Sequence, residues 1–236
     1  MTRGEDLWLL GARVFDGASL HTGLAVQVRE GRVAALVPEN TVGAEAVELP
    51  GGVLAPGFVD LQVNGGGGTL LGDAPTLEGV ARIAAAHTQL GATAVLPTLI
   101  TDRPEVTKAA IEAVVSAVAA EVPGVAGLHL EGPHLAVARK GAHAAERIRP
   151  MAPADLEMLC EAAERLPALM VTVAPETVAP AQIATLADAG VIVSLGHSDA
   201  DYDLVVEAIA AGARCVLCAR AASARARRRA RAASAA

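Results

Sequence analysis

The chain has 236 residues, of which 53% are hydrophobic and 19% charged, enough apolar side chains for one large or two small folded domains. No apolar run reaches the roughly 18–20 residues that span a bilayer, and the first residues, MTRGEDLWLL, lack the long apolar core of a signal peptide. Three cysteines, an odd number, do not form a secreted disulfide framework. These features exclude a membrane protein, and we expect a cytoplasmic one.

The net charge of −7 is unevenly distributed along the chain. Residues 1–218 carry 13 basic and 26 acidic side chains, a net charge of −13, whereas residues 219–236 are ten Ala, six Arg and two Ser. An acidic body argues against nucleic acid as its partner, although a metal could still attract an anionic substrate.

Residues 7–54 contain short apolar runs separated by glycine-containing breaks. Apolar and polar residues alternate in LAVQVREGRVAAL (24–36), and Glu30-Gly31 is a turn signal, so this segment predicts a β-hairpin with one buried face. We expect a small β-sandwich-like module over residues 1–54.

After Pro56 short apolar runs alternate with alanine-rich stretches that have helical spacing. The predicted strands are 58–64, 94–100, 125–133, 169–176, 191–198 and a sixth from 215; the predicted helices are 76–90, 103–120, 153–166, 180–189 and 201–211. This alternation indicates an α/β fold with a parallel sheet covered by helices, either a barrel or a doubly wound sheet.

The positions of the polar residues favour the barrel. They stand at the C-terminal ends of successive predicted strands, where a (β/α)8 barrel gathers its site: Asp60, Gln62, Asn64, Thr98, Thr101, His129, Glu131, His134, Glu176, His197 and Ser198. A doubly wound sheet would place its site at one switch point, and the glycine run 65–68 lacks the other residues of a phosphate loop. We therefore expect a partial TIM-like barrel of about five and a half βα units over residues 55–218.

Two strand-end residues are candidate metal ligands. Glu131 precedes Gly-Pro, where a carboxylate either binds a metal or accepts turn hydrogen bonds. His197 follows the next strand but one, just before a helix that Ser198 or Asp199 should cap. A single strand-end histidine is more often structural, but a carboxylate and an imidazole aimed into one pocket favour a metal site.

Five motifs, in this order, resemble the N-acetylglucosamine-6-phosphate deacetylases of the amidohydrolase superfamily. They are LAPGFVDLQVNGGGG (54–68), PTLIT (97–101), HLEGPHLAVARKGAH (129–143), VAPE (173–176) and SLGHSDADYD (194–203), and the likeness covers residues 7 to about 216. The resemblance implies that a metal-activated water hydrolyses the acetamide of N-acetylglucosamine 6-phosphate, giving glucosamine 6-phosphate and acetate.

The resemblance also implies roles for single residues. Glu131 and His197 match two ligands of one divalent metal ion, zinc, with iron or another divalent ion as alternatives, and His143 matches a residue that contacts the substrate near the reacting amide. Gln62 and Asn64 stand where many relatives carry two histidines for a second metal. Because amides are poor ligands beside imidazole, the pattern favours a single metal over a dihydroorotase-like or hydantoinase-like site. Relatives often form homodimers.

The resemblance stops at Cys218, which occupies the place expected for a third ligand, the histidine of a Thr-His-Leu-Phe/Tyr-Asn motif. Cys215 and Cys218 have C-x-x-C spacing, but strand positions three apart face opposite sides, which disfavours a shared metal. The family's catalytic Asp has no counterpart, so no catalytic residue is assigned. The tail, residues 219–236, has no large apolar side chain with which to build a core.

Two hypotheses of different class follow. The first is a deacetylase; the second is a catalytically inactive fragment with a tail read from a shifted frame, or an interaction protein with a basic tail. We expect the chain as given to release no acetate. Three residues keep open alternatives: His129 faces the barrel core or the site, His134 packs or touches substrate, and Asp60 holds loop backbone or acts in catalysis.

Overall fold

The computed structural model describes residues 7–217. The chain forms two compact units that divide after Gly57, and each is described by itself. Among residues 7–217, no helix has both the length and the apolar character needed to cross a membrane.

Unit 1 contains two small sheets. The first has the strand order β5-β4-β1-β6 and consists of β1 (Leu7–Leu10), β4 (Leu24–Arg29), β5 (Arg32–Pro38) and β6 (Val47–Glu48). The second has the order β3-β2-β7 and consists of β2 (Arg13–Phe15), β3 (Leu20–His21) and β7 (Val53–Leu54). A 3₁₀ turn, Glu39–Thr41, follows β5. Each sheet contributes to a small apolar core, because Val14 of β2 and Val26 of β4 are both buried.

The predicted hairpin of unit 1 is confirmed. Strands β4 and β5 pair antiparallel, and Arg29 lies opposite Arg32 at the end of the ladder. The two residues between them, Glu30 and Gly31, have φ values of 51° and 74°. Two consecutive left-handed residues match the twist of the flanking strands, so this turn joins them without splaying them.

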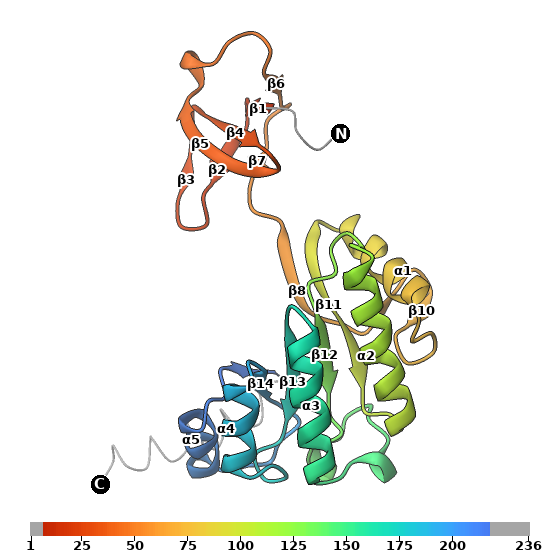
Figure 1. Ribbon diagram of the computed structural model, residues 1–236. Coiled ribbons are helices and arrows are strands. Elements are labelled where there is room, and N and C mark those ends of the chain that lie inside the picture. Colours follow the sequence, from red (N-terminus) through yellow and green to blue (C-terminus); the bar gives the residue numbers. More distant parts are fainter. Residues whose placement is uncertain (1–6, 218–236) are drawn as a thin grey trace, which may run out of the picture. The chain divides into compact units, whose positions relative to one another are not determined.

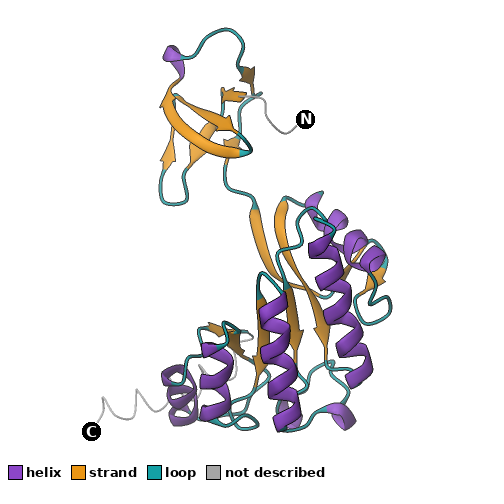
Figure 2. Cartoon of the chain, in the orientation of Figure 1, coloured by secondary structure: helices purple, strands orange, loops and turns teal. Residues whose placement is uncertain are grey.

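Unit 2 is built on one six-stranded parallel sheet with the order β8-β11-β12-β13-β14-β15. Its strands are β8 (Phe58–Val63), β11 (Ala92–Ile100), β12 (Leu128–Glu131), β13 (Leu169–Val173), β14 (Ile192–Leu195) and β15 (Cys215–Val216). Its helices are α1 (Leu77–Thr88), α2 (Pro104–Ala119), α3 (Pro153–Arg165), α4 (Pro180–Asp188) and α5 (Tyr202–Ala210). Figure 1 labels these elements except β15, and Figure 2 distinguishes helices from strands.

The strand order confirms the barrel prediction over the doubly wound alternative. Each strand pairs in parallel with the one before it along the main βα series, so the order never reverses and the sheet has no switch point. The sheet curls as a half-barrel whose strands end at one edge. Strand β12 ends at Glu131, earlier than predicted, because Gly132 turns the chain with a φ of 86°.

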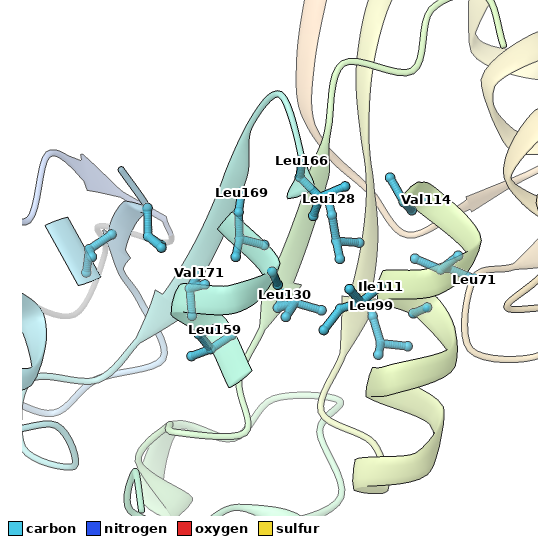
Figure 3. Packing of buried hydrophobic residues seen from close by; sticks show 14 of the residues in the cluster. Leu71, Leu99, Ile111, Val114, Leu128, Leu130, Leu159, Leu166, Leu169 and Val171 are labelled. Atoms are coloured by element: carbon cyan, nitrogen blue, oxygen red, sulfur yellow. The ribbon is translucent and has the colours of Figure 1, made fainter. Parts of the chain in front are cut away.

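A continuous apolar core lies between the sheet and its helices. Alternate strand residues point outward into it, including Leu128 and Leu130 of β12 and Leu169 and Val171 of β13. Helices α2 and α3 close over them, and Figure 3 shows Ile111 and Leu159 within the same cluster. Full burial of each such side chain contributes about 1.5–3 kcal/mol, so the outer face is the main source of stability. The residues between these positions face inward and are free to form a site.

Helix starts follow local signals in the sequence. Helices α2, α3 and α4 each begin with proline, which suits the first helical position, and Thr76 caps α1 by accepting from the Gly79 N–H at 3.1 Å. The prediction that Ser198 or Asp199 caps α5 was wrong. Asp201 is the cap, since its carboxylate accepts from the Leu204 N–H at 3.1 Å.

The glycine run 65–68 is a packing feature. It forms a two-stranded hairpin, β9 (Gly65–Gly66) and β10 (Thr69–Leu70), which contacts α1. A Cβ atom on Gly66 would lie 3.1 Å from Ala86 Cβ, and His87 Nε2 is 3.0 Å from the Gly65 carbonyl oxygen. Glycine therefore lets this hairpin lie close against the helix.

Candidate metal centre

Three side chains meet at the C-terminal edge of the parallel sheet. Glu131 is the last residue of β12, His197 follows the end of β14, and His143 lies on the loop between the 3₁₀ turns Val137–Arg139 and Ala145–Arg147. Each offers one ligand atom, and these atoms lie within 4.8 Å of one another. The residues singled out from the sequence, two as ligands and one as a substrate contact, are thus neighbours in space.

Glu131 is the centre of this cluster. Its carboxylate is 3% exposed; Oε1 lies 2.8 Å from His197 Nε2 and 3.9 Å from His143 Nε2. On the other side, the Gln62 amide donates to Oε2 at 2.9 Å. Burial raises the pKa of Glu131, but hydrogen bonding and charge from His143 and His197 outweigh burial, so the pKa lies below its usual value. Glu131 is therefore held as a carboxylate.

A backbone carbonyl determines which ring nitrogen of His197 carries a proton. His197 Nδ1 is 2.9 Å from the Arg139 carbonyl oxygen. A carbonyl only accepts, so Nδ1 carries a proton, and Nε2 faces Glu131 Oε1 either with a second proton, which it donates, or with a lone pair that can bind a metal ion. Two acceptors at 2.8 Å repel unless a cation, either a proton or a metal ion, lies with them.

His143 has the opposite arrangement. The Thr101 backbone N–H donates to His143 Nδ1 at 3.2 Å, and the Thr101 hydroxyl lies 2.8 Å from the same nitrogen. Because Nδ1 accepts, the neutral ring carries its proton on Nε2 and presents an N–H donor to the pocket. The two imidazoles pack edge to face, with ring centroids 4.5 Å apart. His143 is thus prepared to donate a hydrogen bond, whereas His197 is prepared to bind a cation.

The loop that carries His143 is tied by ion pairs to the segment just before α2 and to α3. Arg147 donates to Asp102 at 2.7 Å, and Arg149 forms a two-point pair with Asp155 near the start of α3. Hydrogen bonding to Arg149 lowers the pKa of Asp155, which favours the ionised carboxylate that this pair requires. These contacts fix the approach of His143 to the cluster.

The donor set of the cluster fits a divalent metal ion. A carboxylate oxygen and an imidazole nitrogen, each with a free lone pair, converge, and both are ligand types that zinc accepts. Each donor also has an orienting partner, Gln62 for Glu131 and the Arg139 carbonyl for His197. Such partners fix ligand orientation and raise metal affinity.

The other polar candidates lie outside the cluster. His129 is buried beneath it on the inner face, His134 is buried and lies 3.1 Å from the Arg149 carbonyl oxygen through Nδ1, and Asp60 accepts from the Gln62 backbone N–H. Burial lowers the pKa of both histidines, that of His129 to about 4. These residues therefore have structural contacts, in line with the packing alternatives.

A separate cavity of about 500 Å³ opens between α2 and α3. Lys108, Asp155 and Met158 are among its lining residues, and none of the three cluster residues lines it. Leu130 borders this cavity while its neighbour Glu131 points to the inner face, because successive strand residues face opposite sides.

Some contributors to the site were not identifiable from the sequence. Thr101 stood out only as a polar residue at a strand end, and Gln62 was considered at a second-metal position and not as a partner of Glu131. Arg139 acts through its carbonyl, a group that every residue possesses. The hypothesis that Cys218 replaces a metal ligand and the tail 219–236 both lie outside the described residues.

Comparison with known proteins identifies the family, although no protein-family model matches the chain. An N-acetylgalactosamine-6-phosphate deacetylase from Shewanella sp. strain ANA-3 is 43% identical over 221 residues, which are 90% of this chain and 55% of that protein. The chain spans about half the length of the curated relatives it matches.

Solved structures agree. The N-acetyl-D-glucosamine-6-phosphate deacetylase of Mycobacterium smegmatis superposes with a TM-score of 0.80 at 34% identity, over 89% of this chain and 55% of that one. The N-acetylglucosamine-6-phosphate deacetylase of Pasteurella multocida gives a TM-score of 0.81 at 29% identity, over 90% of this chain and 56% of that one. The resemblance seen in the motifs is confirmed, and the chain belongs to the family of N-acetylglucosamine- and N-acetylgalactosamine-6-phosphate deacetylases.

Proposed function

We propose that this chain provides the metal-binding part of a hydrolase that removes the acetyl group from N-acetylglucosamine 6-phosphate, giving glucosamine 6-phosphate and acetate. The observation that carries the proposal is the 2.8 Å approach of His197 Nε2 to Glu131 Oε1, with the proton of His197 held on the far nitrogen. Membership of the deacetylase family supports the reaction class.

Glu131 and His197 hold one divalent ion, which we expect to be zinc, with iron as an alternative. Such an ion, when bound, supplies a Lewis acid that polarises the amide carbonyl and lowers the pKa of water. Gln62 keeps the Glu131 carboxylate oriented through its 2.9 Å hydrogen bond, and the Arg139 carbonyl keeps the His197 proton away from the ligand nitrogen. The second-metal positions 62 and 64 carry amides, which supports a single ion.

His143 binds the substrate. Its Nε2–H donor is set by the Thr101 N–H and lies next to Glu131, where the acetamide carbonyl would accept it. A donor aimed at the carbonyl oxygen becomes more effective as negative charge develops there during attack by water. His143 therefore contributes by orienting the amide and stabilising that charge.

N-acetylgalactosamine 6-phosphate is the second candidate substrate. The 43% identity to the Shewanella protein favours it, since that protein is described as acting on the galacto sugar. The two sugars differ in the configuration of one hydroxyl group, whereas the roles proposed for Glu131, His143 and His197 concern the amide, which both sugars share.

The remaining assignments extend the same proposal. Residues 1–54 form a β module, 55–218 an incomplete hydrolase barrel and 219–236 a separate tail. The protein acts in the cytoplasm on a small sugar phosphate, as a homodimer when complete, and binds neither membrane nor nucleic acid. The competing proposal is that the chain is catalytically inactive.

Zinc binding and acetate release by the purified chain test these proposals together. We expect one zinc ion per chain by competition with a chromophoric chelator, lost in Glu131→Gln and His197→Asn and retained in the control His21→Asn of unit 1. Acetate release from either sugar phosphate supports the activity, whereas zinc binding without release supports the inactive alternative. A wild-type chain that binds no zinc contradicts the metal proposal.

A further inference from the structure

We propose that Glu176, the last residue of the VAPE motif, is a positioning residue that fixes His197 for metal binding. The inference rests on the proposed function, because it assumes that His197 is a ligand. Glu176 follows the end of β13 and is not one of the cluster residues.

The backbone at His197 needs outside support. Its φ is 48°, in the left-handed region that a residue with a side chain rarely adopts. Such a conformation persists only where the surroundings determine it, and it frequently marks a functional position. The side chains and backbone groups that surround His197 therefore decide where its ring points.

Glu176 binds the two residues that come directly after His197. Its Oε2 accepts from the Ser198 hydroxyl at 2.7 Å, and its Oε1 accepts from the Asp199 backbone N–H at 2.7 Å. Ser198 Oγ in turn accepts from the Ala200 N–H at 2.9 Å. The Glu176 carboxylate thus accepts one hydrogen bond from each of the two residues that follow His197.

The loop after β12 holds the same segment from the other side. The Ala136 N–H donates to the His197 carbonyl at 3.0 Å, and the Arg139 carbonyl accepts from His197 Nδ1. The Arg139 guanidinium also donates to Asp199 Oδ1 at 2.8 Å. His197 is therefore clamped between the ends of β12 and β13, and Glu176 supplies the β13 side.

The chemistry of the contacts requires a carboxylate at 176. Both oxygens face donors, so an amide would accept one hydrogen bond and turn its own N–H₂ group against the other donor. Glu176 is not one of the residues whose ligand atoms converge in the cluster, and its oxygens are bonded to Ser198 and Asp199. We therefore expect Glu176 to influence metal affinity by fixing the position of His197.

The test compares Glu176→Gln with the matched control Glu112→Gln. Glu112 on α2 is an exposed carboxylate that accepts two hydrogen bonds from Arg165 at 2.6 Å and is not one of the cluster residues. We expect Glu176→Gln to weaken zinc binding about 10–100-fold, as loss of a group that orients a ligand does. We expect Glu112→Gln to leave zinc affinity unchanged and the metal-free melting temperatures of both variants to be similar. The absorption spectrum of bound Co²⁺ should change only in Glu176→Gln.

Each outcome decides the inference. Zinc affinity and a Co²⁺ spectrum equal to wild type in Glu176→Gln overturn it, even if Glu131→Gln abolishes binding and so upholds the metal proposal. A wild-type chain without zinc affinity overturns both. If Glu176→Gln does not fold, Ser198→Ala removes one of the two donors, and an affinity loss smaller than 10-fold but above that of Glu112→Gln is expected; no loss overturns the inference.

Discussion

Two layers of polar side chains occupy the inner face of the parallel sheet. They differ in whether their hydrogen bonds provide a partner for every imidazole nitrogen. In the lower layer His129 lies between two hydroxyl groups, with Nδ1 3.3 Å from Thr98 Oγ1 and Nε2 2.8 Å from Thr172 Oγ1. The Thr98 hydroxyl donates to the Leu96 carbonyl oxygen at 3.0 Å, so it can only accept from Nδ1, whereas the Thr172 hydroxyl can donate to Nε2. Both imidazole nitrogens of His129 therefore have a hydrogen-bond partner within this layer.

The upper layer, Glu131 with His143 and His197, is held by groups of fixed polarity. The Arg139 carbonyl can only accept from His197, and the Thr101 N–H can only donate to His143. A proton is thereby assigned to one nitrogen of each ring, and His197 Nε2 is left facing a carboxylate. The lower layer therefore provides a partner for each nitrogen of His129, whereas the upper layer leaves a site that requires a cation.

The largest expected effect is the loss of zinc affinity in Glu131→Gln, a change in the upper layer. In Glu131→Gln the amide oxygen can accept from Gln62 and the amide N–H₂ can donate to the His197 lone pair, so the metal-free chain should be at least as stable as wild type. Zinc affinity should fall by more than about 100-fold, because loss of a ligand exceeds the effect of an orienting group. Chelator competition and urea unfolding measure the two quantities. Lower metal-free stability with unchanged zinc affinity would reverse the roles of the layers.

The next effect is a pH dependence that originates in the lower layer. Burial lowers the pKa of His129 from 6.5 to about 4. Between these values the unfolded chain binds a proton that the folded chain does not, so stability is lost as the pH falls. From pH 6.5 to pH 5 the loss due to His129 should be about 2 kcal/mol. Urea unfolding of His129→Gln at both pH values should show a smaller loss by that amount; equal losses in both proteins would contradict the neutral buried state.

The smallest effect concerns a single hydroxyl of the lower layer. Thr172→Val keeps the side-chain shape but leaves His129 Nε2 without its partner at 2.8 Å, which should lower the free energy of unfolding by about 1–2 kcal/mol and leave zinc affinity unchanged. The control Thr185→Val removes an exposed hydroxyl on α4 and should change stability by less than about 0.5 kcal/mol. A zinc affinity that falls in Thr172→Val would show that the layers are coupled.

The fold was largely predictable because its signals are local. Each strand of unit 2 is a short apolar run, and proline opens three of the helices, so both kinds of element appear in the sequence near their observed bounds. The positions of Glu131 and His197 at strand ends predicted that they would meet, and their atoms lie 2.8 Å apart.

The hydrogen bonds that assign the protons were not predictable. They come from the Thr101 N–H and the Arg139 carbonyl, whose partners depend on where a loop folds back. The same limit explains the wrong cap prediction, because Ser198 and Asp199 are cap-forming residue types that bond to Glu176, 22 and 23 residues away.

The strand order of unit 2 has a consequence for folding during synthesis on the ribosome. Each βα unit is added next to its predecessor, so the sheet is able to grow outward from β8 as synthesis proceeds. Glu131 is made 66 residues before His197, and the two meet only after β14 has joined β13. A nascent chain therefore acquires most of its hydrophobic core before it acquires the pair of groups that can capture a metal ion.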